Sequence, residues 1–96
     1  MSNASPSSAQ RVQLLVLERI DAARNMARYY VLSLEPTLFD DAALVREWGR
    51  IGRFGGRRVD LYGNGRDARL ALGVWLARKV RRGYVVRSGS SPTDAC

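Results

Sequence analysis

Residues 57–83 read RRVDLYGNGRDARLALGVWLARKVRRG, and this stretch decides the fold class. Its first part, Arg57–Tyr62, has strand character and is followed by a Gly-Asn-Gly turn. The side chain of Asn64 can accept a hydrogen bond from the amide of Asp67, so a capped helix is predicted to begin at this turn. Gly83 is predicted to end the helix as a left-handed cap.

One face of the predicted helix can lie on a sheet. Its residues recur at helical spacing and are Ala68, Leu72, Trp75, Leu76 and Lys79. The sequence therefore assigns Trp75 to the core, with Lys79 at the solvent end of the stripe.

Three further strands are predicted before residue 57. They are Val12–Ile20, Tyr29–Leu34 and Leu44–Ile51. The first also suits a short helix, but its β-rich start favours a strand. The second ends at Pro36, which lacks a backbone donor, and a hairpin loop then leads to the third. Antiparallel strands followed by one covering helix predict an α+β domain, a single sheet packed by one C-terminal helix.

The length of 96 residues allows one domain with a modest core. We expect this domain over residues 11–87, with disordered tails at 1–10, rich in Ser, Ala and Asn, and at 88–96, rich in Ser. No apolar run is long enough to span a membrane, and a single cysteine cannot form an internal disulfide. These features predict a cytoplasmic protein with no membrane partner.

Charge is distributed unevenly along the chain. Residues 1–45 hold four arginines and five acids, whereas residues 46–87 hold eleven arginines and one lysine against three acids. The whole chain carries a net charge of +7, which predicts a polyanionic partner whose binding weakens with salt. The alternative is a basic surface that serves only solubility.

Several enzyme classes have no support in the sequence. Residues 63–68 satisfy the pattern G-x-G-x-x-A, but fewer than thirty residues follow, too few for the rest of a dinucleotide-binding sheet. The chain has no histidine to activate a nucleophile or to bind a metal. The sequence therefore predicts a non-enzyme without cofactor or metal.

The segment Arg46-Glu47-Trp48-Gly49-Arg50 offers a binding chemistry instead. Side chains alternate across a strand, so Arg46, Trp48 and Arg50 are predicted to share one face. An indole between two guanidinium groups can stack on a base or sugar while the arginines bind phosphate. The residue types leave open whether Trp48 is exposed in this way or belongs to the core. Gly49 can admit a close backbone approach or form a bulge.

Trp48-Gly49-Arg50 within residues 44–52 resembles the signature of the WGR domain family. Residues 25–30, 35–39 and 78–84 are also similar to the small bacterial members. The resemblance covers Leu14 to Tyr84 and implies a single antiparallel sheet packed by one helix. It also implies recognition of DNA ends and breaks, as in the poly(ADP-ribose) polymerases that carry this domain. The tryptophan that packs on a terminal nucleotide would be Trp48.

In those polymerases the motif arginine, here Arg50, also takes part in contacts with other domains. The chain contains no such domain and no polymerase catalytic domain, so the resemblance implies no enzymatic activity.

The sequence thus predicts a non-catalytic nucleic-acid-binding module, with DNA favoured over RNA. The expected nucleic-acid-binding residues are Arg46, Trp48, Gly49, Arg50, Arg53, Arg57, Arg58, Lys79, Arg81 and Arg82. A protein-interaction module is the alternative, because tryptophan and arginine are also favoured interface anchors and a basic surface suits an acidic partner.

Overall fold

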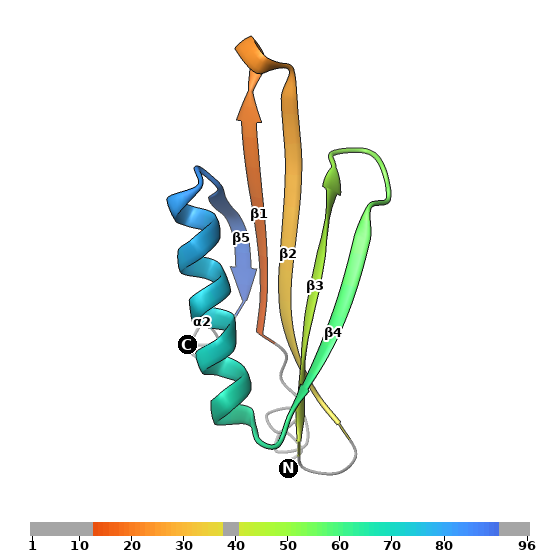
Figure 1. Cartoon of the computed structure of the whole chain (residues 1–96), viewed down its shortest axis with the longest axis vertical. Helices are drawn as coiled ribbons and strands as arrows, with labels where there is room; N and C mark the ends of the chain where they lie inside the picture. The colour runs from red at the N-terminus through yellow and green to blue at the C-terminus, as the bar shows by residue number, and fades with distance from the viewer. Residues whose placement is uncertain (1–12, 38–40, 91–96) are drawn as a thin grey trace, which may run out of the picture.

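The structure, a computed structural model, describes residues 13–37 and 41–90. One antiparallel sheet carries one long helix on one of its faces (Figure 1). In chain order the elements are β1 (Gln13–Asp21), the short 3-10 turn η1 (Ala22–Arg24), β2 (Met26–Pro36), β3 (Ala42–Arg50), β4 (Gly56–Tyr62), α2 (Gly65–Arg81) and β5 (Val85–Ser90). The predicted α+β class is confirmed.

The five strands lie in the order β4-β3-β2-β1-β5, and every neighbouring pair is antiparallel. Strands β1 to β4 form a meander, in which each strand pairs with the one before it. Because β4 and β5 occupy opposite edges, α2 has to cross one face of the sheet to connect them (Figure 1). The crossing places the helix over the central strands.

The core lies between α2 and the sheet. Leu17, Leu32 and Leu44, one from each of the three central strands, have no exposed surface. Ala68 and Leu72 pack against this cluster from the helix. The helical stripe predicted from the sequence is confirmed, since Trp75 and Leu76 also pack on the cluster as partly buried side chains.

Both predicted helix ends are confirmed. The Asn64 side chain accepts a hydrogen bond from the Asp67 amide at 2.8 Å, which satisfies one of the free donors of the first turn. Gly83 directly follows the C-cap residue Arg82 and has a φ of 102°, a conformation that an L side chain rarely adopts.

The predicted strands are confirmed with small changes in length. The first is a strand rather than a short helix, and it pairs along its whole length with β2. Strand β2 begins three residues earlier than predicted, directly after Asn25, whose φ of 51° reverses the chain direction at the end of η1. Pro36 ends β2, as its missing donor predicts.

Strand β5 was not predicted. It pairs with β1, and it extends through Ser90, past the domain boundary expected at residue 87. Ser88 and Gly89, which the sequence assigned to a tail, therefore belong to the sheet. Gly89 lies against Leu15, where a Cβ would stand 2.7 Å from a side-chain carbon. The tails expected at 1–10 and 91–96 lie outside the described residues.

The β1–β2 hairpin extends beyond the carboxyl-terminal end of α2 (Figure 1). The helix therefore covers only part of its face of the sheet. Next to the helix end, side chains that β2 and β3 direct to this same face have no helix above them. This uncovered part of the sheet holds the candidate site.

Candidate functional site

Trp48 is half-buried on the helix-bearing face of β3, with 37% of its surface exposed. Its ring stacks on that of Tyr30, the residue paired with it on β2, with centroids 6.1 Å apart and planes 17° from parallel. On the β4 side the indole lies over Gly56, where a Cβ would stand 2.5 Å from its ring carbons. The neighbours hold one side of the indole and leave part of it open to solvent.

Beside Trp48 the surface forms a cleft with a volume of about 290 Å³. We call it the aromatic cleft, and its lining residues are Arg28, Tyr30, Trp48, Gly49, Arg50, Lys79 and Tyr84. Strands β2 and β3 supply one wall, and the end of α2 with the residue before β5 supplies the other. Three aromatic rings and three cations thus face one opening.

Lys79 brings a positive charge from α2 into this cleft. Its Nζ lies 4.3 Å from the ring centroid of Tyr30 and 5.5 Å from that of Tyr84, distances that permit cation–π attraction. Burial lowers the pKa of Lys79 below its usual value, and the positive charges of Arg82 and Arg46 lower it further. A bound anion would relieve this repulsion.

Arg50 lies at the rim of the cleft and is exposed. Its guanidinium donates to the backbone oxygen of Asn25 at 3.2 Å and to the side-chain oxygen of the same residue at 3.4 Å. These contacts tie the end of β3 to the β1–β2 turn. A guanidinium has five N–H donors, so Arg50 keeps donors for a ligand while it holds the turn.

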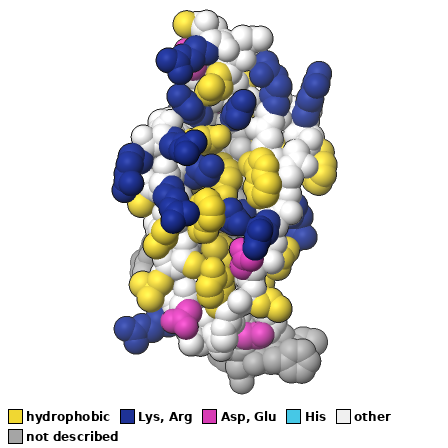
Figure 2. All heavy atoms as spheres, in the orientation of Figure 1, with side chains coloured by type: hydrophobic (Ala, Val, Ile, Leu, Met, Phe, Trp, Pro, Cys, Tyr) yellow, Lys and Arg dark blue, Asp and Glu magenta, His cyan; other side chains and the backbone are white. Residues whose placement is uncertain are grey.

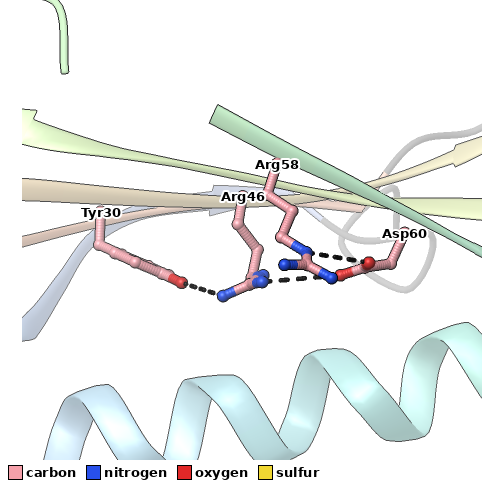
Figure 3. Close-up of polar contacts among 4 residues, drawn as sticks. All are labelled: Tyr30, Arg46, Arg58 and Asp60. Atoms are coloured by element: carbon pink, nitrogen blue, oxygen red, sulfur yellow. Dashed lines mark hydrogen bonds and ion pairs between the residues drawn. The ribbon is translucent and has the colours of Figure 1, made fainter. Parts of the chain in front are cut away.

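Arg46 shares the strand face of Trp48, as predicted, but only 8% of its surface is exposed. Its guanidinium donates to the Tyr30 hydroxyl at 3.2 Å, lies 3.6 Å from the Asp60 carboxylate and stacks 3.9 Å from the Trp75 ring centroid. Figure 3 shows the group between the sheet and α2, with Arg58 on the same carboxylate. The sequence predicted an open side chain here. The structure corrects this, because alternation fixes the strand face and the helix then covers this position.

Gly49 is part of regular strand and forms no bulge. A Cβ on Gly49 would stand 3.0 Å from the Cα of Gly55 and 3.1 Å from the Tyr29 ring. The close backbone approach is therefore made by the β3–β4 turn of the same chain.

The other predicted arginines occupy separate surfaces. Arg57 pairs with Glu47 at 3.4 Å, and strand alternation places both on the sheet face opposite the cleft. Arg58 lies on the helix-bearing face and pairs with Asp60 at 3.1 Å. Arg53 is exposed in the β3–β4 turn.

Arg81 and Arg82 are exposed at the end of α2. Figure 2 shows Lys and Arg side chains over the upper half of the helix-bearing face, with most of the visible acids below them.

The structure thus brings Trp48, Gly49, Arg50 and Lys79 together in one cleft. Sequence reasoning missed three further cleft residues, which are Arg28, Tyr30 and Tyr84. The signal for Tyr30 was its position in an aromatic strand, but only the strand register shows that it lies directly opposite Trp48.

Residues 13–91 match the WGR domain family, a span that includes every described strand and the helix. The chain belongs to the WGR domain family. An uncharacterized protein, y4dW of Sinorhizobium fredii, is 52% identical to this WGR chain over 71 residues. These residues are 73% of the chain and 34% of that relative, so the chain spans about a third of the relative's length.

Two other kinds of site find no support in this WGR domain. In residues 13–37 and 41–90, no group of three or more His, Cys, Asp or Glu side chains could hold a metal ion. None of the helices described is long and apolar enough to span a bilayer.

Proposed function

We propose that this WGR domain is a non-catalytic nucleic-acid-binding module that binds DNA in preference to RNA and favours ends, breaks or junctions. One observation carries the proposal. The open part of the Trp48 indole faces a cleft that also holds the cations Arg28, Arg50 and Lys79. An aromatic ring surrounded by phosphate-binding cations is the combination that single strands and unpaired ends require.

The geometry suggests how such an end would bind. A sugar or base at a strand terminus would pack on the free part of Trp48, and Tyr30 behind the indole would hold it in place. Arg28, Arg50 and Lys79 would contact the adjacent phosphates. This use of Trp48 agrees with the role that the family resemblance implies.

Surrounding charges would extend the contact beyond the cleft. Arg53, Arg81 and Arg82 are exposed and are available to further phosphates. In this proposal the cations contact phosphates and α2 does not enter the major groove, so sequence specificity should be weak. A role on DNA in a bacterial cell would place the protein in the cytoplasm.

The decisive experiment compares closed circular, nicked circular and blunt-ended linear DNA of the same sequence in a mobility-shift titration. We expect the nicked and linear forms to bind more tightly than the closed circle. Trp48→Ala should weaken binding to these two forms by about tenfold, the size of a lost stacking contact, and should change binding to the closed circle far less.

Arg87→Ala is the matched control, because Arg87 pairs with Glu18 on the opposite face of the sheet and its loss also removes one positive charge. Since Trp48 is half-buried, Arg28→Ala provides a second test with an exposed residue. Equal losses on all three DNA forms in the Trp48 variant would remove the stacking contact from the proposal.

A protein-interaction module is the second candidate, favoured by the outer face of α2. Leu70 and Val74 are exposed there, one turn apart, with Arg66 and Arg81 at the two ends of the same stripe. An apolar stripe between arginines suits an acidic partner. If no DNA form binds at moderate salt and an acidic protein does, this second function replaces the first.

A further inference from the structure

Phe54 is a large apolar side chain that the described part of the fold leaves in solvent. Its exposed fraction of 83% is the highest among the exposed large hydrophobic residues. It lies in the turn between β3 and β4, six residues after Trp48. Turns of this kind are commonly built from Gly, Asn, Asp and Ser, so the turn itself does not require an aromatic ring.

The turn that carries Phe54 is held firmly to the sheet. The Ile51 amide donates to the Ala27 oxygen at 2.9 Å, and the Arg53 amide donates to the Arg50 oxygen at the same distance. These two bonds anchor the first half of the turn to β2 and to the end of β3.

The second half of the turn packs directly on Trp48. A Cβ on Gly55 would stand 1.9 Å from the Trp48 backbone oxygen, and a Cβ on Gly56 would meet the indole ring. Phe54, which directly precedes these glycines, is therefore carried by the same rigid hairpin that positions Trp48.

The turn is also cationic. Exposed Arg53 precedes the phenylalanine, and no acidic residue occurs between positions 51 and 59. Arg57 and Arg58 follow on β4, where they pair with Glu47 and Asp60. A second copy of this turn would be repelled by these charges. An apolar ring between arginines matches an opened base step, where an unstacked base lies between two phosphates.

We propose that Phe54 is an apolar wedge that enters an interrupted or weakly stacked base step of the nucleic acid. This inference rests on the proposed function. A continuous duplex resists such entry because the stacked bases have to separate, whereas a nick or gap has already lost backbone continuity. Phe54 thus adds a preference for interrupted duplex to the contacts made in the aromatic cleft.

The test uses two dumbbell duplexes, closed by loops at both ends, one continuous and one with a two-nucleotide gap. A 2-aminopurine beside the gap, and at the same position in the continuous form, reports unstacking by an increase in fluorescence. The proteins are the full chain, Phe54→Ala, Phe54→Trp and the control Leu70→Ala, which shortens an exposed apolar side chain on α2.

We expect the unmodified protein to raise the fluorescence of the gapped duplex. Phe54→Ala should lose this signal and bind the gapped duplex about tenfold more weakly, with less than about twofold change on the continuous one. Phe54→Trp should retain both properties, and Leu70→Ala should behave as the unmodified protein. Matching melting temperatures would show that the turn variants remain folded.

The inference and the proposed function fail in different ways. If the unmodified protein binds neither duplex, the proposed function fails. If it binds both but Phe54→Ala keeps the fluorescence signal and the affinity, only the wedge is overturned. Phe54-dependent sedimentation with phosphatidylcholine–phosphatidylserine vesicles, together with DNA binding that ignores Phe54, would also overturn it and assign the ring to a membrane surface.

Discussion

Arg46 carries a positive charge into the space between the sheet and α2. Asp60, the Tyr30 hydroxyl and the Trp75 ring compensate most of this charge, while its Nε has no hydrogen-bond partner among the described residues. A buried ion pair adds little stability relative to a well-packed apolar replacement, but truncating one of its partners is costly. Arg46 contacts both Asp60 and the Tyr30 hydroxyl, and it thereby holds in place the tyrosine ring on which Trp48 stacks.

Arg46→Ala should therefore lower the free energy of unfolding by about 2–4 kcal/mol, because it leaves a cavity under α2 and takes the donor from the Tyr30 hydroxyl, while Asp60 keeps its contact with Arg58. Urea unfolding followed by tryptophan fluorescence measures this loss. Arg58→Ala is the control, since the exposed Arg58 binds the same carboxylate and should contribute below about 1 kcal/mol. Equal losses in the two variants would contradict the structural role of Arg46.

Lys79 shows how a residue proposed to bind DNA can oppose folding. The pKa of Lys79 is lower in the folded state than in the unfolded chain. At pH values between these two pKa values, the unfolded chain therefore binds more protons than the folded protein. The unfolding free energy should accordingly rise with pH in that alkaline window, with the full penalty present at neutral pH. Lys79→Met should remove the penalty and make the protein more stable at neutral pH.

The same variant should weaken DNA binding. Loss of one phosphate contact would reduce the slope of log affinity against log salt by about 0.9. DNA affinity of the unmodified protein should fall as the pH rises through the lowered pKa of Lys79, because a bound phosphate favours the charged amine. Lys79→Arg should abolish that pH dependence, and titrations of the three proteins from neutral to alkaline pH test it. A Lys79→Met variant that keeps both affinity and salt slope would place Lys79 outside the interface.

Helix α2 contains a glycine that its packing does not need. A Cβ added at Gly73 meets no atom within 4 Å, and the residue is exposed at mid-helix. Gly73→Ala should raise the free energy of unfolding by about 0.5–1 kcal/mol through helix propensity.

Gly83 provides the opposite case at the end of the same helix. Its φ of 102° is strained for any L side chain, so Gly83→Ala should lower the free energy of unfolding by about 1–2 kcal/mol. Denaturant titrations of the two alanine variants side by side give the comparison. A stabilised Gly83→Ala protein would contradict the helix cap described here.

The meander and its crossing helix gather many Lys and Arg side chains over the upper half of the helix-bearing face of the molecule (Figure 2). The net charge of +7 favours long-range attraction of polyanions, and in the proposed function the cleft would select among them.

If about four phosphates are contacted, log affinity for DNA should fall against log salt with a slope near −3.6. Fluorescence anisotropy with a short labelled duplex across a series of salt concentrations measures the slope. Micromolar or tighter binding that does not change with salt would contradict an interface built on phosphates.

Local sequence determines the ends of the helix, its buried stripe and the face to which each strand side chain points. The Asn64 cap, the Gly83 stop and the helical stripe from Ala68 to Lys79 are readable because caps and helix periodicity depend on neighbours within a few residues. Strand alternation likewise places Arg46 and Trp48 on one face from the sequence alone.

The contacts of those side chains depend on how distant elements pack together. Alternation could not show that α2 covers Arg46 and leaves Trp48 partly exposed, because this depends on where a helix from one sheet edge crosses to the other. The aromatic cleft likewise joins residues of β2, β3 and α2 that are distant in sequence. Strand β5, rich in Ser and Gly, was missed because pairing with β1, rather than its own propensity, holds it in the sheet.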